Sequence, residues 1–87
     1  MQASASRIEQ AILDLVAARG TAKSICPSEA ARTLGGARWR VLMPAVHRAA
    51  LQLALAGRID ITQRGKRLDP SQAWAGPVRF RQPGPDR

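Results

Sequence analysis

The chain has 87 residues, of which 45% are hydrophobic, and its formal net charge at pH 7 is +8. This length predicts one small domain, assigned to residues 1–87, with an ordered core at 6–81 and a flexible tail at 82–87. The single cysteine excludes an internal disulfide and a multi-cysteine zinc site, and it favours a cytoplasmic location. No apolar run reaches the about 18 residues of a membrane span, and the opening MQASASRIEQ lacks a secretory signal, so no membrane association is expected.

Two amphipathic segments come first along the chain. Apolar residues recur at helical spacing over residues 7–19, and Ser6 with Glu9 has the pattern of a capping box. An extended piece at residues 24–25 is followed by a shorter helix at 27–34, which opens on a proline at its first position. The pattern predicts two helices joined by a short extended link.

The longest periodic signal covers residues 37–57. Trp39, Val46 and Leu53 fall on one arc together with other apolar residues, which predicts the core-facing side of a helix. Proline inside a helix removes a backbone hydrogen bond, so we expect a turn at 39–43 and a main helix at 44–56, with a helix kinked at Pro44 as the alternative. The opposite arc mixes charged and apolar side chains: Arg40, Pro44, His47, Arg48, Leu51 and Leu55.

A short alternating strand follows within GRIDITQRGKRL, residues 57–68, and it breaks at a tight turn where Gly65 can adopt the required positive φ. The strand should bury Ile59 and Ile61 on one face and expose Asp60 and Thr62 on the other. A final strand is expected at residues 77–81, where apolar and basic residues alternate. These elements predict a mainly α fold with a small β-hairpin and sheet, a winged helix-turn-helix of three to four helices plus the wing.

The positive charge is concentrated in the later part of the chain. Residues 1–37 carry a net +1, whereas residues 38–87 carry a net +7. A basic surplus of this kind attracts a polyanion through its long-range field and through counterion release. The candidate nucleic-acid-binding residues lie on the third helix and on the wing: Arg38, Arg40, His47, Arg48, Arg64, Lys66 and Arg67.

The sequence offers little for catalysis or for a cofactor. His47 is the only histidine, and no acidic residue lies within a helical turn of it, so a base or metal ligand is not expected there. Cys26 directly precedes a helix, and its expected role is that of a small buried residue. We therefore expect no enzyme activity, no cofactor, no metal and no small-molecule substrate.

Aromatic residues are few. The chain has two Trp, one Phe and no Tyr, which argues against single-strand binding, a mode that relies on several exposed rings. Trp39 is expected in the core, and Trp74 is expected to fold back over Leu51 and Leu55. Double-stranded DNA is therefore the favoured nucleic acid.

The segments KSICPSEAARTLGG, WRVLMPAVHRAALQLALAGRIDITQRGKRLDP and GPVRFR resemble an uncharacterised bacterial domain-of-unknown-function family. The resemblance covers about residues 7–81, and it implies a short, stand-alone winged helix. His47 stands where this family more usually has arginine, so the resemblance does not imply a permanent positive charge at that position. No functional residue follows from the resemblance.

The sequence thus predicts a non-catalytic nucleic-acid-binding module, with a transcriptional regulator as one such role, which grips double-stranded DNA through the basic helix and the wing. The alternative is a protein-interaction module, or a homodimer, that uses Leu51, Leu55 and Trp74 as apolar anchors.

Overall fold

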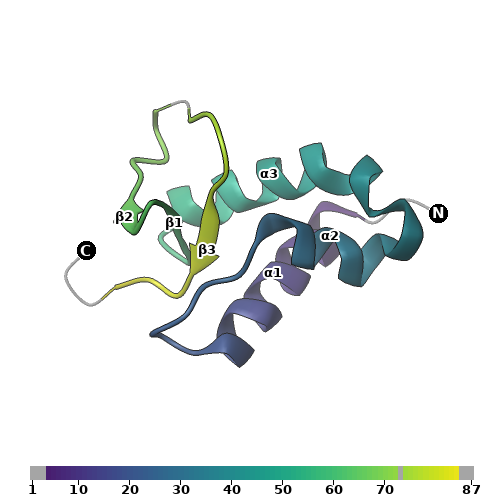
Figure 1. Ribbon diagram of the computed structural model, residues 1–87, viewed down its shortest axis with the longest axis horizontal. Coiled ribbons are helices and arrows are strands. Elements are labelled where there is room, and N and C mark those ends of the chain that lie inside the picture. The colour runs from purple at the N-terminus through teal and green to yellow at the C-terminus, as the bar shows by residue number, and fades with distance from the viewer. Residues whose placement is uncertain (1–3, 73, 85–87) are drawn as a thin grey trace.

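The computed structural model describes residues 4–72 and 74–84, so the predictions for residues 1–3 and for the last part of the tail, 85–87, lie outside it. In chain order the described elements are α1 (Ala5–Arg19), α2 (Pro27–Gly35), a 3₁₀ turn (Gly36–Arg38), α3 (Trp39–Leu55), β1 (Asp60–Gln63), β2 (Lys66–Arg67) and β3 (Arg79–Arg81). The strands form one antiparallel sheet beside the carboxyl-terminal part of α3 (Figure 1). A mainly helical fold with a small sheet is therefore confirmed.

Helix α1 buries the stripe that its periodicity predicts, with Ile8, Ile12 and Val16 in the core. Its start differs from the prediction, because the cap is Ser4 and not Ser6. The Ser4 hydroxyl accepts a hydrogen bond from the backbone N–H of Arg7 at 3.3 Å. Such a cap satisfies one of the amide groups that the first turn leaves without a helical partner, so the helix begins earlier than predicted.

Helices α2 and α3 are separated by one 3₁₀ turn. Helix α2 opens on Pro27, as predicted, and its C-cap is Gly36, whose φ of 54° suits a residue without a Cβ. The small Ala30 and Ala31 are fully buried, which allows α3 to approach closely. The prediction that Cys26 is buried was wrong, because this residue caps α2 and is half-exposed.

The predicted break of α3 at Pro44 was also wrong, since one helix runs continuously through that residue. Proline has no N–H to donate to the carbonyl of Arg40, and both residues are exposed, so water can reach this part of the helix. The turns before Pro44 also contribute half-buried side chains to the core, those of Trp39, Leu42 and Met43. This packing offsets the missing hydrogen bond.

The sheet has the order β2-β1-β3, and Ile25 extends it by an isolated antiparallel bridge to Phe80. The backbones of these two residues exchange hydrogen bonds of 2.7 and 2.9 Å. The predicted extended link before α2 is thus confirmed, and Phe80 packs in the core together with Ile61, its register partner on β1.

The predicted exposure of Asp60 and Thr62 was wrong, because both are buried. Strand β1 is the central strand, paired on both edges. The chain also returns past it, since the backbone N–H of Gly84 donates to Asp60 Oδ2 at 2.9 Å. At Asp60 this contact covers a position that simple alternation assigns to the solvent side, so the pattern of the strand alone does not predict its burial.

The turn between β1 and β2 has positive φ at two successive residues, 53° at Arg64 and 81° at Gly65. Two positive φ angles are the mark of a type I′ hairpin turn, and the predicted role of Gly65 is confirmed. A longer loop then joins β2 to β3. The Gln63 side chain holds it by donating to the carbonyl oxygens of Ala75 and Pro77 at 2.6 and 3.2 Å.

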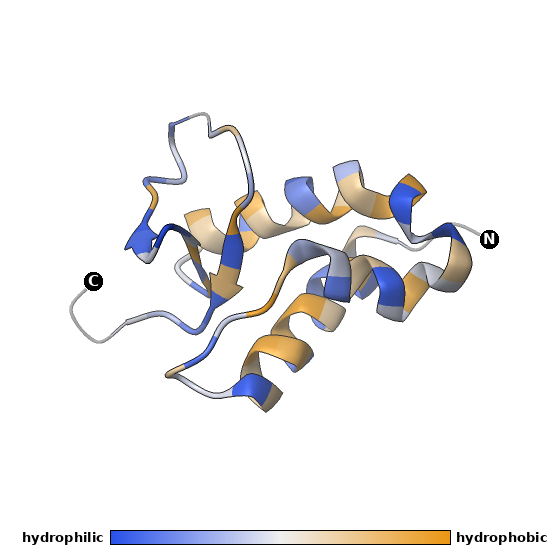
Figure 2. Ribbon diagram, in the orientation of Figure 1, coloured by the Kyte–Doolittle hydropathy of each residue, from blue (hydrophilic) through white to orange (hydrophobic). Residues whose placement is uncertain are grey.

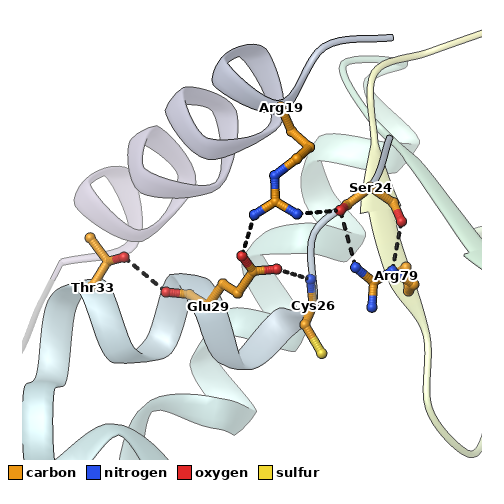
Figure 3. Close-up of polar contacts among 6 residues, drawn as sticks. All are labelled: Arg19, Ser24, Cys26, Glu29, Thr33 and Arg79. Atoms are coloured by element: carbon orange, nitrogen blue, oxygen red, sulfur yellow. Dashed lines mark hydrogen bonds and ion pairs between the residues drawn. The ribbon is translucent and has the colours of Figure 1, made fainter. Parts of the chain in front are cut away.

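A polar network joins α1, the Ser24 link, α2 and β3 (Figure 3). Glu29 Oε2 accepts from the backbone N–H of Cys26 at 2.7 Å, and its other oxygen pairs with Arg19. Arg19 and Arg79 both donate to the carbonyl oxygen of Ser24. The Cys26 amide, and then Arg19, hold the pKa of Glu29 below its ordinary value of 4.5.

We expect Glu29→Gln to lower the free energy of unfolding by about 0.5 to 1 kcal/mol at pH 7, because the neutral amide is a weaker acceptor for both partners. Because the pKa of Glu29 is lower in the folded protein than in the unfolded chain, this stabilisation is complete above about pH 4.5. It is lost as the pH falls through the pKa of Glu29 in the folded protein. Urea unfolding at pH 7 and at about pH 3 should therefore show the two proteins converging in acid. An equal difference at both pH values would contradict this.

Candidate nucleic-acid interface

The side of α3 that faces away from the core carries both charged and apolar side chains. Arg48 and Val41 share this side with Gln52, and all three line a groove of about 320 Å³ between α3 and the start of α1. Val41 is 70% exposed, the largest fraction among the big hydrophobic residues that the structure describes. Helix α3 contains no acidic residue, so its positive charges have no carboxylate on their own helix.

The amino end of α3 holds a cluster that we call the Trp39 cluster, made of Arg32, Trp39 and Arg40. The guanidinium carbon of Arg32, at the end of α2, lies 4.6 Å from the centroid of the Trp39 ring. That of Arg40 lies 4.4 Å from the same centroid. One indole ring thus holds two exposed arginines from two helices within about 9 Å of each other.

The energies explain how two like charges can share this ring. In water, two unit charges repel by about 0.5 kcal/mol at about 9 Å, the largest separation that the two ring distances allow, and by about 0.8 kcal/mol at about 5 Å, and salt reduces both values. Each exposed cation–π contact contributes about 0.5 to 1 kcal/mol of attraction. The ring therefore attracts the two guanidinium groups more strongly than they repel each other.

His47 is half-buried and lies against Trp74, with ring centroids 6.5 Å apart at an interplanar angle of 67°. Trp74 comes from the β2–β3 loop and packs on the core, so its predicted placement within the fold is confirmed, but its predicted cover over Leu51 and Leu55 is not. Leu51 is half-buried, whereas Leu55 remains 54% exposed. His47 is therefore the least accessible of the candidate residues on α3.

The hairpin cations Arg64, Lys66 and Arg67 are all exposed, as expected. Strand β2 and the turn before it lie beyond the carboxyl end of α3, where Figure 2 shows a strongly hydrophilic stretch. Arg79 is exposed too, but it donates to Ser24 Oγ at 2.6 Å and so helps to hold β3 to the link before α2.

The candidate residues therefore fall into separate groups along α3. Arg38 and Arg40 lie at its amino end, Arg48 lies midway, and the hairpin cations lie past its carboxyl end. A helix of 17 residues is about 25 Å long, so the two ends are far apart. They do not meet in a single pocket.

Two residues of this region, Arg32 and Val41, were not predicted from the sequence. Arg32 lies on α2, and its contact with Trp39 arises because the Gly35–Gly36 turn folds α2 back on α3. Only a tertiary contact reveals it. The exposure of Val41 could be predicted from the sequence. At about 100° per residue, its side chain lies roughly 200° around the helix from that of Trp39 and therefore away from the core arc.

In the part of the chain that the structure describes, no group of three His, Cys, Asp or Glu side chains is arranged to hold a metal ion. None of the helices seen there combines the length and the apolar character that crossing a bilayer requires.

No curated protein matches this chain. A family match, in contrast, extends over nearly all of the fold, from the start of α1 to just past β3, at residues 5–83. Because the match covers most of the sequence, the chain belongs to the family described as "Protein of unknown function (DUF3253)".

Proposed function

We propose that this protein is a winged helix-turn-helix module that binds double-stranded DNA without catalysing a reaction. Two helices, α2 and α3, meet across a tight turn, and the strands follow α3. Ile25, between α1 and α2, pairs with β3, and β3 pairs with β1. In this proposal the wing is the whole segment between β1 and β3, of which the basic β1–β2 hairpin is the first part.

The observation that carries the proposal is the set of exposed cations without an internal partner. The side chain of Arg48 on α3 forms no hydrogen bond or ion pair with any described residue, and neither do the side chains of the three hairpin cations. Side chains of this kind are free to meet an external anion. Arginine forks fit guanine edges in the major groove, and projecting basic hairpins contact phosphates.

The test is fluorescence anisotropy with a labelled random-sequence duplex. We expect binding at about 50 mM salt, with an affinity that falls steeply as salt is raised, because each neutralised phosphate releases counterions. The absence of any anisotropy change at micromolar protein and about 50 mM salt would contradict DNA binding.

A second candidate, a protein-interaction surface, is favoured by the exposure of Val41 and Leu55 on the same helix. Apolar side chains at the surface can serve as anchors for a protein partner or for a second copy of the chain. A mass that rises with concentration in light scattering, and that Val41→Asp returns to the monomer value, would favour this candidate over DNA binding.

A further inference from the structure

We propose that the Trp39 cluster is a phosphate clamp, in which Arg32 and Arg40 together bind a backbone phosphodiester of the DNA. This inference rests on the proposed DNA-binding function and adds to it a residue, Arg32, that lies outside the reading helix. It also assigns Arg40 to the DNA backbone, which leaves Arg48 as the arginine of α3 available to the bases.

The first argument is charge. Helix α2 has one acidic residue, Glu29, and it is already occupied by Arg19 and by the Cys26 amide. The 3₁₀ turn and α3 have none in their sequences. The side chains of Arg32 and Arg40 accordingly form no ion pair or hydrogen bond within the described residues, although both lie on the Trp39 ring. An anion bound between them would remove their mutual repulsion.

The second argument is geometry. A guanidinium group stacked on an indole ring has one face covered and its N–H edge directed outward. Contact with one ring restricts both side chains, so part of their conformational freedom is already lost before binding. Arginine donates two parallel hydrogen bonds to a phosphate, which fits this arrangement.

The third argument is position. The cluster surrounds the turn between α2 and α3, at the end of α3 opposite the hairpin (Figure 1). If α3 lies in a major groove, its two ends approach the sugar-phosphate strands that border the groove. A base edge carries no net charge and could not offset two cations, so a phosphate is the better ligand.

The experiment compares the wild type with Arg32→Gln, Arg32→Lys and Lys23→Gln. Lys23 is exposed in the loop between α1 and α2, and its substitution removes the same charge. Affinity for a labelled random-sequence duplex is measured between about 50 and 300 mM salt. Urea unfolding of each variant checks that the fold is kept.

We expect Arg32→Gln to weaken binding about five- to tenfold near 0.1 M salt and to reduce the slope of log K against log salt by about 0.9, as for the loss of one phosphate contact. Arg32→Lys should recover the slope but bind less tightly than the wild type, because lysine keeps the charge without the planar stacked fork. Lys23→Gln should leave the slope unchanged.

The indole supplies an independent readout. In a Trp74→Phe background Trp39 is the one remaining tryptophan, and its emission should change when duplex is added. If the wild type binds duplex but Arg32→Gln behaves like Lys23→Gln, the clamp is wrong while the proposed DNA binding stands. If the wild type does not bind duplex at all, both are wrong.

Discussion

Phe80→Ala is expected to lower the free energy of unfolding by about 3 to 5 kcal/mol, the usual cost of emptying a fully buried aromatic site. Phe80 has no exposed surface, and its backbone joins the Ile25 bridge to the rest of the sheet. The total stability of a small domain is about 5 to 15 kcal/mol, so this loss is a large share of it. Urea unfolding followed by circular dichroism should show a transition midpoint far below that of the wild type.

The matched control is Val41→Ala, which removes apolar atoms from a side chain that is 70% exposed. Its unfolding free energy should stay within about 0.5 kcal/mol of the wild type, because surface truncations cost little. If both variants lost the same stability, Phe80 would not be the centre of the core.

The triple variant Arg64→Asn, Lys66→Gln, Arg67→Gln is expected to lose most of the DNA affinity while keeping the fold. Three phosphate contacts contribute about 2.7 to the salt slope, which corresponds to a loss of up to roughly 500-fold at 0.1 M salt. The substitution at Arg64 also places asparagine before Gly65, the preferred pair for a type I′ turn, and the positive φ at Arg64 shows that this turn is present. Stability should therefore be equal to or slightly above that of the wild type.

A variant that loses DNA affinity while its stability stays equal or rises is not misfolded, so the loss of affinity can be assigned to the removed charges. Anisotropy titrations at several salt concentrations give the slope of log K against log salt, and urea unfolding gives the free energy of unfolding. A double variant, Arg7→Gln with Lys23→Gln, removes two exposed charges away from the outward side of α3 and should keep nearly the wild-type slope. An unchanged slope of log K against log salt in the triple variant would show that the hairpin does not contact the DNA.

Local patterns predicted much of the fold because they depend only on neighbours in the sequence. The stripe of Ile8, Ile12 and Val16 on α1 follows from helical periodicity, and the turn at Gly65 follows from backbone freedom. Errors appeared where a distant segment contributed. Asp60 was predicted to be exposed because its own strand alternates, but the returning chain at Gly84 bonds to it.

In the candidate interface, too, some features follow from local patterns in the sequence and others depend on contacts between distant segments. The positive later half, the basic hairpin and the arginines on a long helix were predicted from the sequence, since charge and periodicity can be read residue by residue. Which of these charges are engaged and which are free depends on the folded structure: Arg79 bonds to Ser24, His47 lies against Trp74, and Arg32 joins Arg40 on Trp39. The physical reason is that such contacts depend on how the helices and the sheet pack. Packing brings together residues that are far apart in the sequence, and no local pattern shows which of them will meet.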